Sequence, residues 1–299
     1  CAISAAGELA VIKGAVLGAE ENRLVWADAA GSVNAEPAVG APKGRRSAVA
    51  ISPDGTRAVV LVSTPVGPET WIADWARNIW VAYTDCDARG RRVWSLDGAR
   101  IALVCRDRRD SLIVRTSDGS APEKVLVQEP GRRLRVDAWL ADGRIVYTSS
   151  ADDAAFEVKV LSPGAPAGTL LLQGGVTAEV DVSPDGKWMA YSAQQSDRSE
   201  VVVQAFAAGG PRAQVSAGGG YNAAWASDSR TVYFLKPPGG QVLHAVQAID
   251  GGAIRPGTPR EVLRHSRAQG CVPYRCYDIS TDGKRFLFSE PTAESPTVS

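Results

Sequence analysis

The sequence has little of the residue types on which many catalytic and metal sites depend. Its 299 residues include two histidines, one methionine and five cysteines. Two histidines make a three-histidine metal site impossible within the chain. It also lacks a Gly-x-Ser-x-Gly elbow, a P-loop and a Gly-x-Gly-x-x-Gly sequence after a strand. We therefore expect a protein that is not an enzyme and that holds neither a metal nor another cofactor.

The chain has no excess of charge of either sign and no long apolar segment. Its 33 basic residues are balanced by 33 acidic ones, so no overall field attracts nucleic acid. No apolar run approaches the roughly 20 residues that span a bilayer, which excludes direct membrane insertion of this segment. We interpret the short basic runs at residues 43–46, 106–109 and 132–135 as solvated loops.

What the sequence does have is a six-residue phrase that recurs seven times. The fifth copy, residues 181–186, reads Asp-Val-Ser-Pro-Asp-Gly, and the copies succeed one another at intervals of 43 to 54 residues. A period in the low forties is typical of propeller blades. The copies are residues 2–7, 50–55, 93–98, 138–143, 181–186, 224–229 and 278–283.

Each copy has the properties of a tight turn between two strands. In the fifth copy, Pro184 sets φ, Asp185 hydrogen-bonds to nearby backbone, and Gly186 accepts a positive φ. Apolar runs flank the turn, as in an antiparallel hairpin. A third apolar run, such as residues 112–114, follows in most copies, and a weaker fourth run, such as residues 124–127, closes the unit. Four strands of this kind make one propeller blade.

The number of copies predicts an all-β propeller of seven four-stranded antiparallel blades. Seven units of about 43 residues match the length of 299, so residues 1–299 are expected to form a single domain. The alternative is six blades, with the first or last hairpin completing a blade shared by both ends of the chain. Because the first copy begins at residue 1 and the last unit is short, we expect this chain to be a piece of a longer protein.

Tryptophans recur just before the turns and in the second unit. Trp94, Trp139 and Trp225 follow small or aliphatic residues on the strand predicted to lie nearest the axis. We interpret them as packing between blades, since buried aromatic rings mostly contribute packing area. Residues 69–83 could form a helix with Trp71 and Trp75 on one face. The phase of the repeat instead predicts a strand over residues 71–74.

The cysteines form two candidate disulfide pairs. Cys271 and Cys276 lie five residues apart, before the last predicted inner strand. Cys86 precedes the third inner strand and Cys105 ends its hairpin partner, so both are expected near one rim. Disulfides there would indicate an oxidising compartment, whereas reduced thiols are the alternative. Cys1 is left over and is attributed to the boundary of the sequence.

The remaining polar residues have structural interpretations. His244 lies in a predicted strand and His265 follows another, and a lone histidine in a strand is usually structural. The aspartates of the repeat are needed for its turns and lack the closely spaced carboxylates that calcium prefers. No metal site is therefore predicted from them.

Residues 52–55, 94–98 and 183–186 resemble the repeats of TolB-type propellers, bacterial relatives of the tryptophan–aspartate repeat proteins. Three further segments resemble the propeller that follows some bacterial membrane-anchored serine/threonine kinases: residues 23–28, 214–220 and 277–287. That resemblance implies a propeller outside the cytoplasmic membrane that acts as a sensor or docking surface. Copies one and six depart from the family's turn, and the family supplies no catalytic residues to carry over.

The leading hypothesis is a monomeric, non-catalytic domain that binds a protein or peptide outside the cytoplasm of a bacterium. The alternatives are an accessory propeller that gates a peptidase or hydrolase domain of the parent chain, and a propeller enzyme with a metal on its axis. The loops between second and third strands are the expected contact surface, because loops often carry function. The candidate contact residues in or near this rim are Trp75, Arg108, Arg109 and Tyr221.

Overall fold

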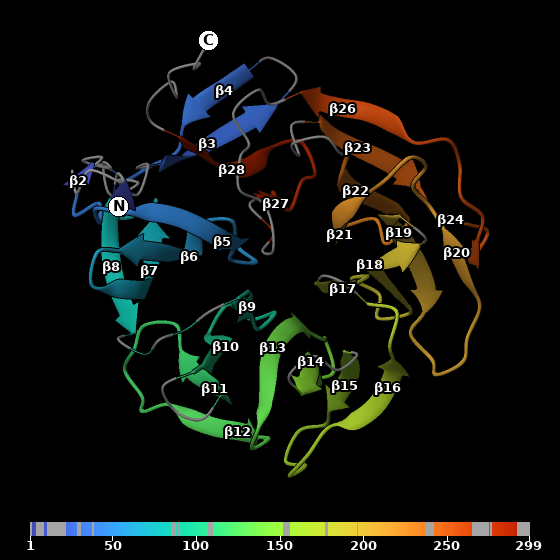
Figure 1. The fold of residues 1–299 in the computed structure, drawn as a ribbon, viewed down its shortest axis with the longest axis horizontal. Coiled ribbons are helices and arrows are strands. Elements are labelled where there is room, and N and C mark those ends of the chain that lie inside the picture. Colours follow the sequence, from blue (N-terminus) through green and yellow to red (C-terminus); the bar gives the residue numbers. More distant parts are fainter. Residues whose placement is uncertain are drawn as a thin grey trace.

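The repeated hairpins are arranged radially around a common axis in the computed structural model of the protein (Figure 1). Each hairpin supplies the inner strand and the second strand of a sheet, and two further strands extend the sheet outward. The structure describes residues 2–3, 9–10, 22–28, 31–37, 39–84, 86, 88, 90–106, 110–151, 156–176, 179–195, 197–236, 242–264, 275 and 277–291.

Within these residues, six antiparallel sheets have four strands each, and we number them as blades from inner to outer strand. Blade 1 contains β27 (Tyr277–Ile279), β28 (Phe286–Pro291), β3 (Asn22–Asp28) and β4 (Gly31–Asn34). Blade 2 contains β5 (Arg45–Ile51), β6 (Arg57–Thr64), β7 (Gly67–Asp74) and β8 (Ile79–Thr84). Blade 3 contains β9 (Val93–Trp94), β10 (Arg100–Cys105), β11 (Ser111–Thr116) and β12 (Lys124–Gln128).

The other three blades follow in chain order. Blade 4 contains β13 (Arg132–Trp139), β14 (Ile145–Ala151), β15 (Glu157–Leu161) and β16 (Thr169–Gln173). Blade 5 contains β17 (Val180–Val182), β18 (Trp188–Gln195), β19 (Arg198–Ala205) and β20 (Arg212–Gln214). Blade 6 contains β21 (Tyr221–Trp225), β22 (Thr231–Lys236), β23 (Val242–Gln247) and β26 (Arg260–Arg264). A small hairpin of β24 (Ile249–Asp250) and β25 (Ala253–Ile254) lies between β23 and β26 in the chain.

The prediction of seven blades is wrong, and the alternative of six is correct. The last hairpin does not have a third strand of its own: β28 pairs with β3 from the start of the chain, with Phe288 opposite Val25. The described part of the first copy, β1 (Ala2–Ile3), lies outside the six blades: among the described residues it pairs with β2 (Leu9–Ala10) in a two-stranded sheet. The repeat therefore counts hairpins correctly, but one blade is shared by the two ends, which removes a free sheet edge.

The hydrophobic core is divided among the interfaces between blades. Each of the six neighbouring pairs of blades encloses one cluster of buried apolar side chains from the described residues. Along β6, Ala58, Val60 and Val62 face blade 1, whereas Val59 faces blade 3. Because side chains of a strand alternate between faces, a strand buried on both sides has the continuous apolar run seen in the sequence.

The segment around Trp71 is a strand, as the phase of the repeat predicts. Residues 67–74 form β7, with Val60 paired to Trp71, and residues 79–84 form β8. Trp94 and Trp225 are buried in clusters between blades, which confirms their predicted packing role.

Candidate functional site

In blades 1, 2, 3 and 5 the recurring turn is held by a hydrogen-bonded serine–aspartate pair. Ser183 Oγ donates to Asp185 Oδ1 at 2.6 Å, and the Trp188 amide donates to Ser183 Oγ at 3.0 Å. The last copy has the same pattern, with Ser280 Oγ donating to Asp282 at 2.6 Å. This hydrogen bond lowers the pKa of the Asp282 carboxyl group. The aspartates of the repeat thus make the turns, as the sequence indicates.

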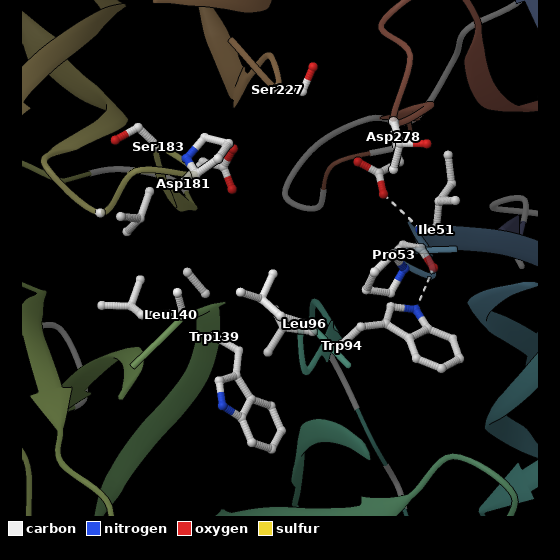
Figure 2. A pocket seen from close by; sticks show the side chains of 18 of the residues that line it. Ile51, Pro53, Trp94, Leu96, Trp139, Leu140, Asp181, Ser183, Ser227 and Asp278 are labelled. Carbon is white, nitrogen blue, oxygen red and sulfur yellow. Dashed lines mark hydrogen bonds between the residues drawn. The ribbon is translucent and has the colours of Figure 1, made fainter. Parts of the chain in front are cut away.

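These turns surround the mouth of a cavity on the propeller axis (Figure 2). The connections between inner and second strands have five residues in blades 2 to 6 and six in blade 1, so they lie at similar heights. We name the face that carries them the turn face. The cavity has a volume of about 510 Å³, and its lining includes Ile51, Pro53, Trp94, Leu96, Trp139 and Leu140. Leu96 is 60% exposed at the mouth.

Asp181 is the centre of a charged cluster at the axis. Arg91 Nη1 donates to Asp181 Oδ1 at 2.9 Å, and the amide of Trp225 donates to Asp181 Oδ2 at 2.8 Å. Arg275 Nη1 lies 3.6 Å from Asp181 Oδ2, and Arg275 Nη2 lies 3.1 Å from Asp278 Oδ1. Asp181 therefore joins blade 5 to residues that precede the inner strands of blades 3 and 1. Blade 5 neighbours neither of these blades, so both ion pairs extend across the axial region.

Further polar contacts complete a circuit around the axis. Arg91 Nη1 also donates to the Asp137 carbonyl of blade 4 at 2.8 Å. Asp278 accepts the Ile51 amide of blade 2 at 2.7 Å, and Trp94 Nε1 donates to the Ala50 carbonyl at 2.9 Å. Together with the Asp181 contacts, these bonds connect all six blades. Because Arg91, Asp181 and Asp278 also line the cavity, the same network forms its polar floor.

A second buried acid, Glu179, lies two residues before Asp181 and has a different environment. Glu179 is 2% exposed, and neither of its carboxylate oxygens has a hydrogen-bond partner among the described residues. Burial raises the pKa of Glu179, and the nearby charges of Arg91 and Arg275 offset this only in part. Burial also acts to raise the pKa of Asp181, but its closer contacts with the same two arginines lower it overall. The surroundings of Asp181 thus stabilise its charged form, whereas those of Glu179 destabilise its charged form.

Two tryptophans on the cavity wall differ in exposure. Trp94 is buried, and the guanidinium of Arg57 lies 4.9 Å from the centre of its ring. Trp139 is only partly buried, and the guanidinium of Arg100 lies 5.0 Å from its ring centre. In both pairs the arginine comes from the preceding blade, shortly after its turn, so the stacking fastens neighbouring blades.

The opposite face of the ring has a covalent link. Cys86 follows β8 and Cys105 ends β10, and their sulfur atoms form a disulfide. The bond ties the connection between blades 2 and 3 to the second strand of blade 3. The other candidate pair, Cys271 and Cys276, lies outside the described residues.

Two of the four predicted contact residues, Trp75 and Tyr221, are among the described residues, and they lie at opposite ends of the blades. Trp75 follows β7 near the turn face, where its amide donates to the Thr56 carbonyl at 3.0 Å and its ring packs 5.5 Å from that of Trp26. Tyr221 starts the inner strand of blade 6, at the other end of the blades, and packs against the cluster shared with blade 1. Arg108 and Arg109 lie outside the described residues. Their role in binding stays a prediction.

The charged floor was missed by the sequence reasoning, although a signal for it exists. Asp181 and Asp278 stand five residues before the turn glycine of their copies. The corresponding residues of the other blades are small or aliphatic: Ala50, Val93, Ala138 and Ala224. A departure from the repeat at an inner-strand position, rather than the repeat itself, marks the site.

No group of three metal-binding side chains gathers anywhere in the described part of the chain. His244 stacks on Phe234, with 5.6 Å between ring centres. That contact supports its structural interpretation. The described residues also contain no helix long and apolar enough to cross a membrane.

Comparison with known proteins gives structural matches but no sequence match. No protein-family model and no curated protein matches the sequence. The structure is similar to the putative TolB of Agrobacterium tumefaciens, with a TM-score of 0.68 at 15% identity, covering 92% of this chain and 99% of that one. TolB from Acinetobacter baumannii gives a TM-score of 0.55 at 13% identity, covering 93% of this chain and 65% of that one.

The fold is that of a TolB-type β-propeller. The β-propeller domain of the Trilobed protease from Pyrococcus furiosus is also similar, with a TM-score of 0.55 at 13% identity over 85% of this chain and 81% of that one. At these identities the likeness establishes the TolB-type fold alone, so the partner must be argued from the site. The predicted attachment to a kinase stays a prediction.

Proposed function

We propose that this propeller is a non-catalytic module that binds a protein or peptide outside the cytoplasm, with the axial cavity of the turn face as its docking site. The observation that carries this proposal is a cavity of about 510 Å³ with an apolar wall and an ion-paired floor. Its volume lies within the range of roughly 300–1,000 Å³ that is usual for ligand sites.

The lining favours a partner that inserts an apolar side chain. Leu96, Leu140 and Ile279 come from three blades and face the same cavity. An inserted apolar group would remove the exposed surface of Leu96 from water, which is a main source of binding energy. The polar atoms of Asp181 and Asp278 already have partners within the propeller. The floor therefore offers a fixed polar surface that needs no rearrangement when a partner docks.

The disulfide supports a location outside the cytoplasm. Such bonds persist in oxidising compartments and are rare in the cytosol. Cys86 and Cys105 are both buried in the cluster between blades 2 and 3, so the bond is part of the folded core. The resemblance to TolB-type propellers supports the same compartment.

A matched pair of substitutions tests the docking site. Leu96 on the turn face and Val66 on the opposite face are both exposed apolar residues, at 60% and 89%. A phage-displayed library of random peptides is selected on the folded protein, and the selected peptides are measured against Leu96→Asp and Val66→Asp. We expect Leu96→Asp to weaken binding by about tenfold or more and Val66→Asp to leave it unchanged. The opposite ranking would place the site on the other face, and turnover of a small substrate without peptide binding would exclude a binding module.

The second candidate is an accessory propeller that gates a peptidase domain of the parent chain. It is favoured by the similarity to the propeller domain of the Trilobed protease. The ion pairs from Arg91 and Arg275 to Asp181 extend across the axial region, which disfavours passage of a peptide along the axis. Sequencing the parent gene decides the matter, since a hydrolase elbow beside this segment would support gating and an upstream kinase would exclude it.

A further inference from the structure

A second hollow lies between blades 3 and 4, and the axial site does not account for it. This groove has a volume of about 460 Å³. Its sides come from the ends of β11 and β15, the start of β12 and the turn after β15 at residues 162–165. Trp139 is common to the linings of the groove and the axial cavity.

The charged side chains that line the groove are all cations. Arg100 and Lys124 contribute to it from the face of blade 3 that packs on blade 4, and no carboxylate lines it among the described residues. Arg115 also lines it, but its guanidinium lies on the other face of blade 3, against Tyr83. The nearest acidic partner of Arg100 is Asp97, at 3.7 Å in an exposed pair that water screens. Lys124 is exposed, and it forms no ion pair with another described residue. The groove therefore has an excess of positive charge in a protein whose formal net charge is zero.

One of these cations is held in place before any ligand arrives. The guanidinium of Arg100 lies 5.0 Å from the ring centre of Trp139. Arg115 is held against blade 2 instead, where its Nη1 donates to the Tyr83 carbonyl at 3.0 Å. Because the Arg100 side chain is already ordered, pairing with an anion would cost it little conformational entropy.

The rest of the lining is aliphatic and offers few hydrogen bonds. Val114, Leu126, Ile145 and Leu161 form most of it, and all four belong to or pack against the cluster between blades 3 and 4. Thr116 and Ser162 are its only uncharged polar side chains among the described residues. A peptide backbone buried here would leave polar groups without partners, which costs free energy. A hydrocarbon chain has no such groups.

We propose that this groove binds an anionic amphiphile, namely a fatty acid whose hydrocarbon chain lies along the aliphatic wall and whose carboxylate faces Lys124 and Arg100. The site is independent of the peptide site on the axis. If the groove binds no fatty acid, the proposed peptide docking at the axis is unaffected, since Trp139 is the one described residue that lines both sites.

Calorimetric titration with decanoate, below the concentration at which it forms micelles, tests the proposal. Octanoate and decyltrimethylammonium serve as the shorter-chain and opposite-charge probes. We expect decanoate to bind at one site. Each buried methylene should strengthen binding by up to about fourfold, so octanoate should bind more weakly. Decyltrimethylammonium should bind more weakly than decanoate.

Reversing the charge of Lys124 distinguishes decanoate binding in the groove from non-specific binding to apolar surface elsewhere. Lys124→Glu should weaken decanoate binding by about fivefold or more and strengthen that of decyltrimethylammonium. Lys43→Glu makes the same change of net charge at an exposed residue before blade 2 and should alter neither. Absence of decanoate binding at millimolar concentration would overturn the proposal. Equal affinities of the wild type and Lys124→Glu for decanoate would also overturn it.

Discussion

The two faces of the ring are built from the same strands but differ in regularity. On the turn face, the connections have five or six residues and are held by the repeated turn. On the opposite face, the connections between second and third strands have two residues in blades 2 and 5 and five in blades 3, 4 and 6. The disulfide also lies there. The turn face therefore has connections of nearly equal length around one cavity, whereas the connections on the opposite face differ in length from blade to blade.

The comparison shows that repetition and specificity reside in different residues. The repeat places a turn in every blade, but the charged floor comes from Asp181 and Asp278 in only two blades and from arginines that precede inner strands. If this division is correct, changes at the floor should affect the whole ring, and changes on the opposite face should act locally.

The largest expected effect follows from Asp181→Asn. The substitution keeps the size of the side chain but removes the charge shared by Arg91 and Arg275. Loss of one partner of a buried ion pair typically costs about 3–5 kcal/mol, so we expect a decrease of that size in the free energy of unfolding. Urea denaturation measures it. The control is Glu261→Gln in the exposed Arg264–Glu261 pair, for which we expect less than about 1 kcal/mol. Equal losses in both variants would contradict the central role of Asp181.

The next effect concerns the disulfide on the opposite face. The bond joins residues 19 positions apart, and closing a loop of this size stabilises a protein by about 3 kcal/mol. Reduction by dithiothreitol should therefore lower the midpoint of urea denaturation. The double variant Cys86→Ser, Cys105→Ser should have the lowered midpoint without reductant and should not respond to it. A wild-type midpoint that reductant leaves unchanged would argue against the bond.

Glu179→Gln should distinguish the two buried acids by pH dependence. The folded-state pKa of Glu179 is raised above its ordinary value of 4.5. The contribution of Glu179 to the free energy of unfolding is therefore fully present below pH 4.5 and is lost as pH rises through the folded-state pKa. Because glutamine does not titrate, we expect the Glu179→Gln variant to lack this decrease in stability with rising pH. At neutral pH it should therefore be more stable than the wild type.

Asp181 has the opposite dependence. The folded-state pKa of Asp181 is lowered from 3.8. Its contribution to the free energy of unfolding is therefore present above pH 3.8 and is lost as pH falls through the folded-state pKa. The free energy of unfolding, measured between pH 3 and 8 for the wild type and for each variant, tests the pH dependence of both acids.

A Glu179→Gln variant that is less stable than the wild type at neutral pH would contradict the prediction for Glu179. It would mean that the glutamate is ionised and well solvated or paired.

The fold could be predicted from the sequence because its determinants are local and repeated. Ser183, Asp185 and Gly186 make one turn by contacts within six residues, and the same contacts recur along the chain. The blade number could not be obtained in this way. It depends on the pairing of Phe288 with Val25, residues that are remote in sequence and that no local pattern connects.

The site was harder to predict for the same reason. Arg91 and Asp181 are 90 residues apart and lie in blades that are not neighbours. Arg275 joins them from a third blade. Their polar contacts depend on how the blades close into a ring, so the only local signal is an aspartate where other copies have alanine or valine. Trp94 and Trp139 look alike in sequence, yet their exposure differs.

The most direct test of the central claim is a chemical-shift map of a bound peptide selected as described above. Methyl resonances of leucine, isoleucine and valine are compared with and without the peptide. We predict perturbations at Leu96, Leu140 and Ile279, which line the axial cavity, and none at Val66 on the opposite face. Perturbation of Val66 with no change at Leu96, Leu140 and Ile279 would contradict the account.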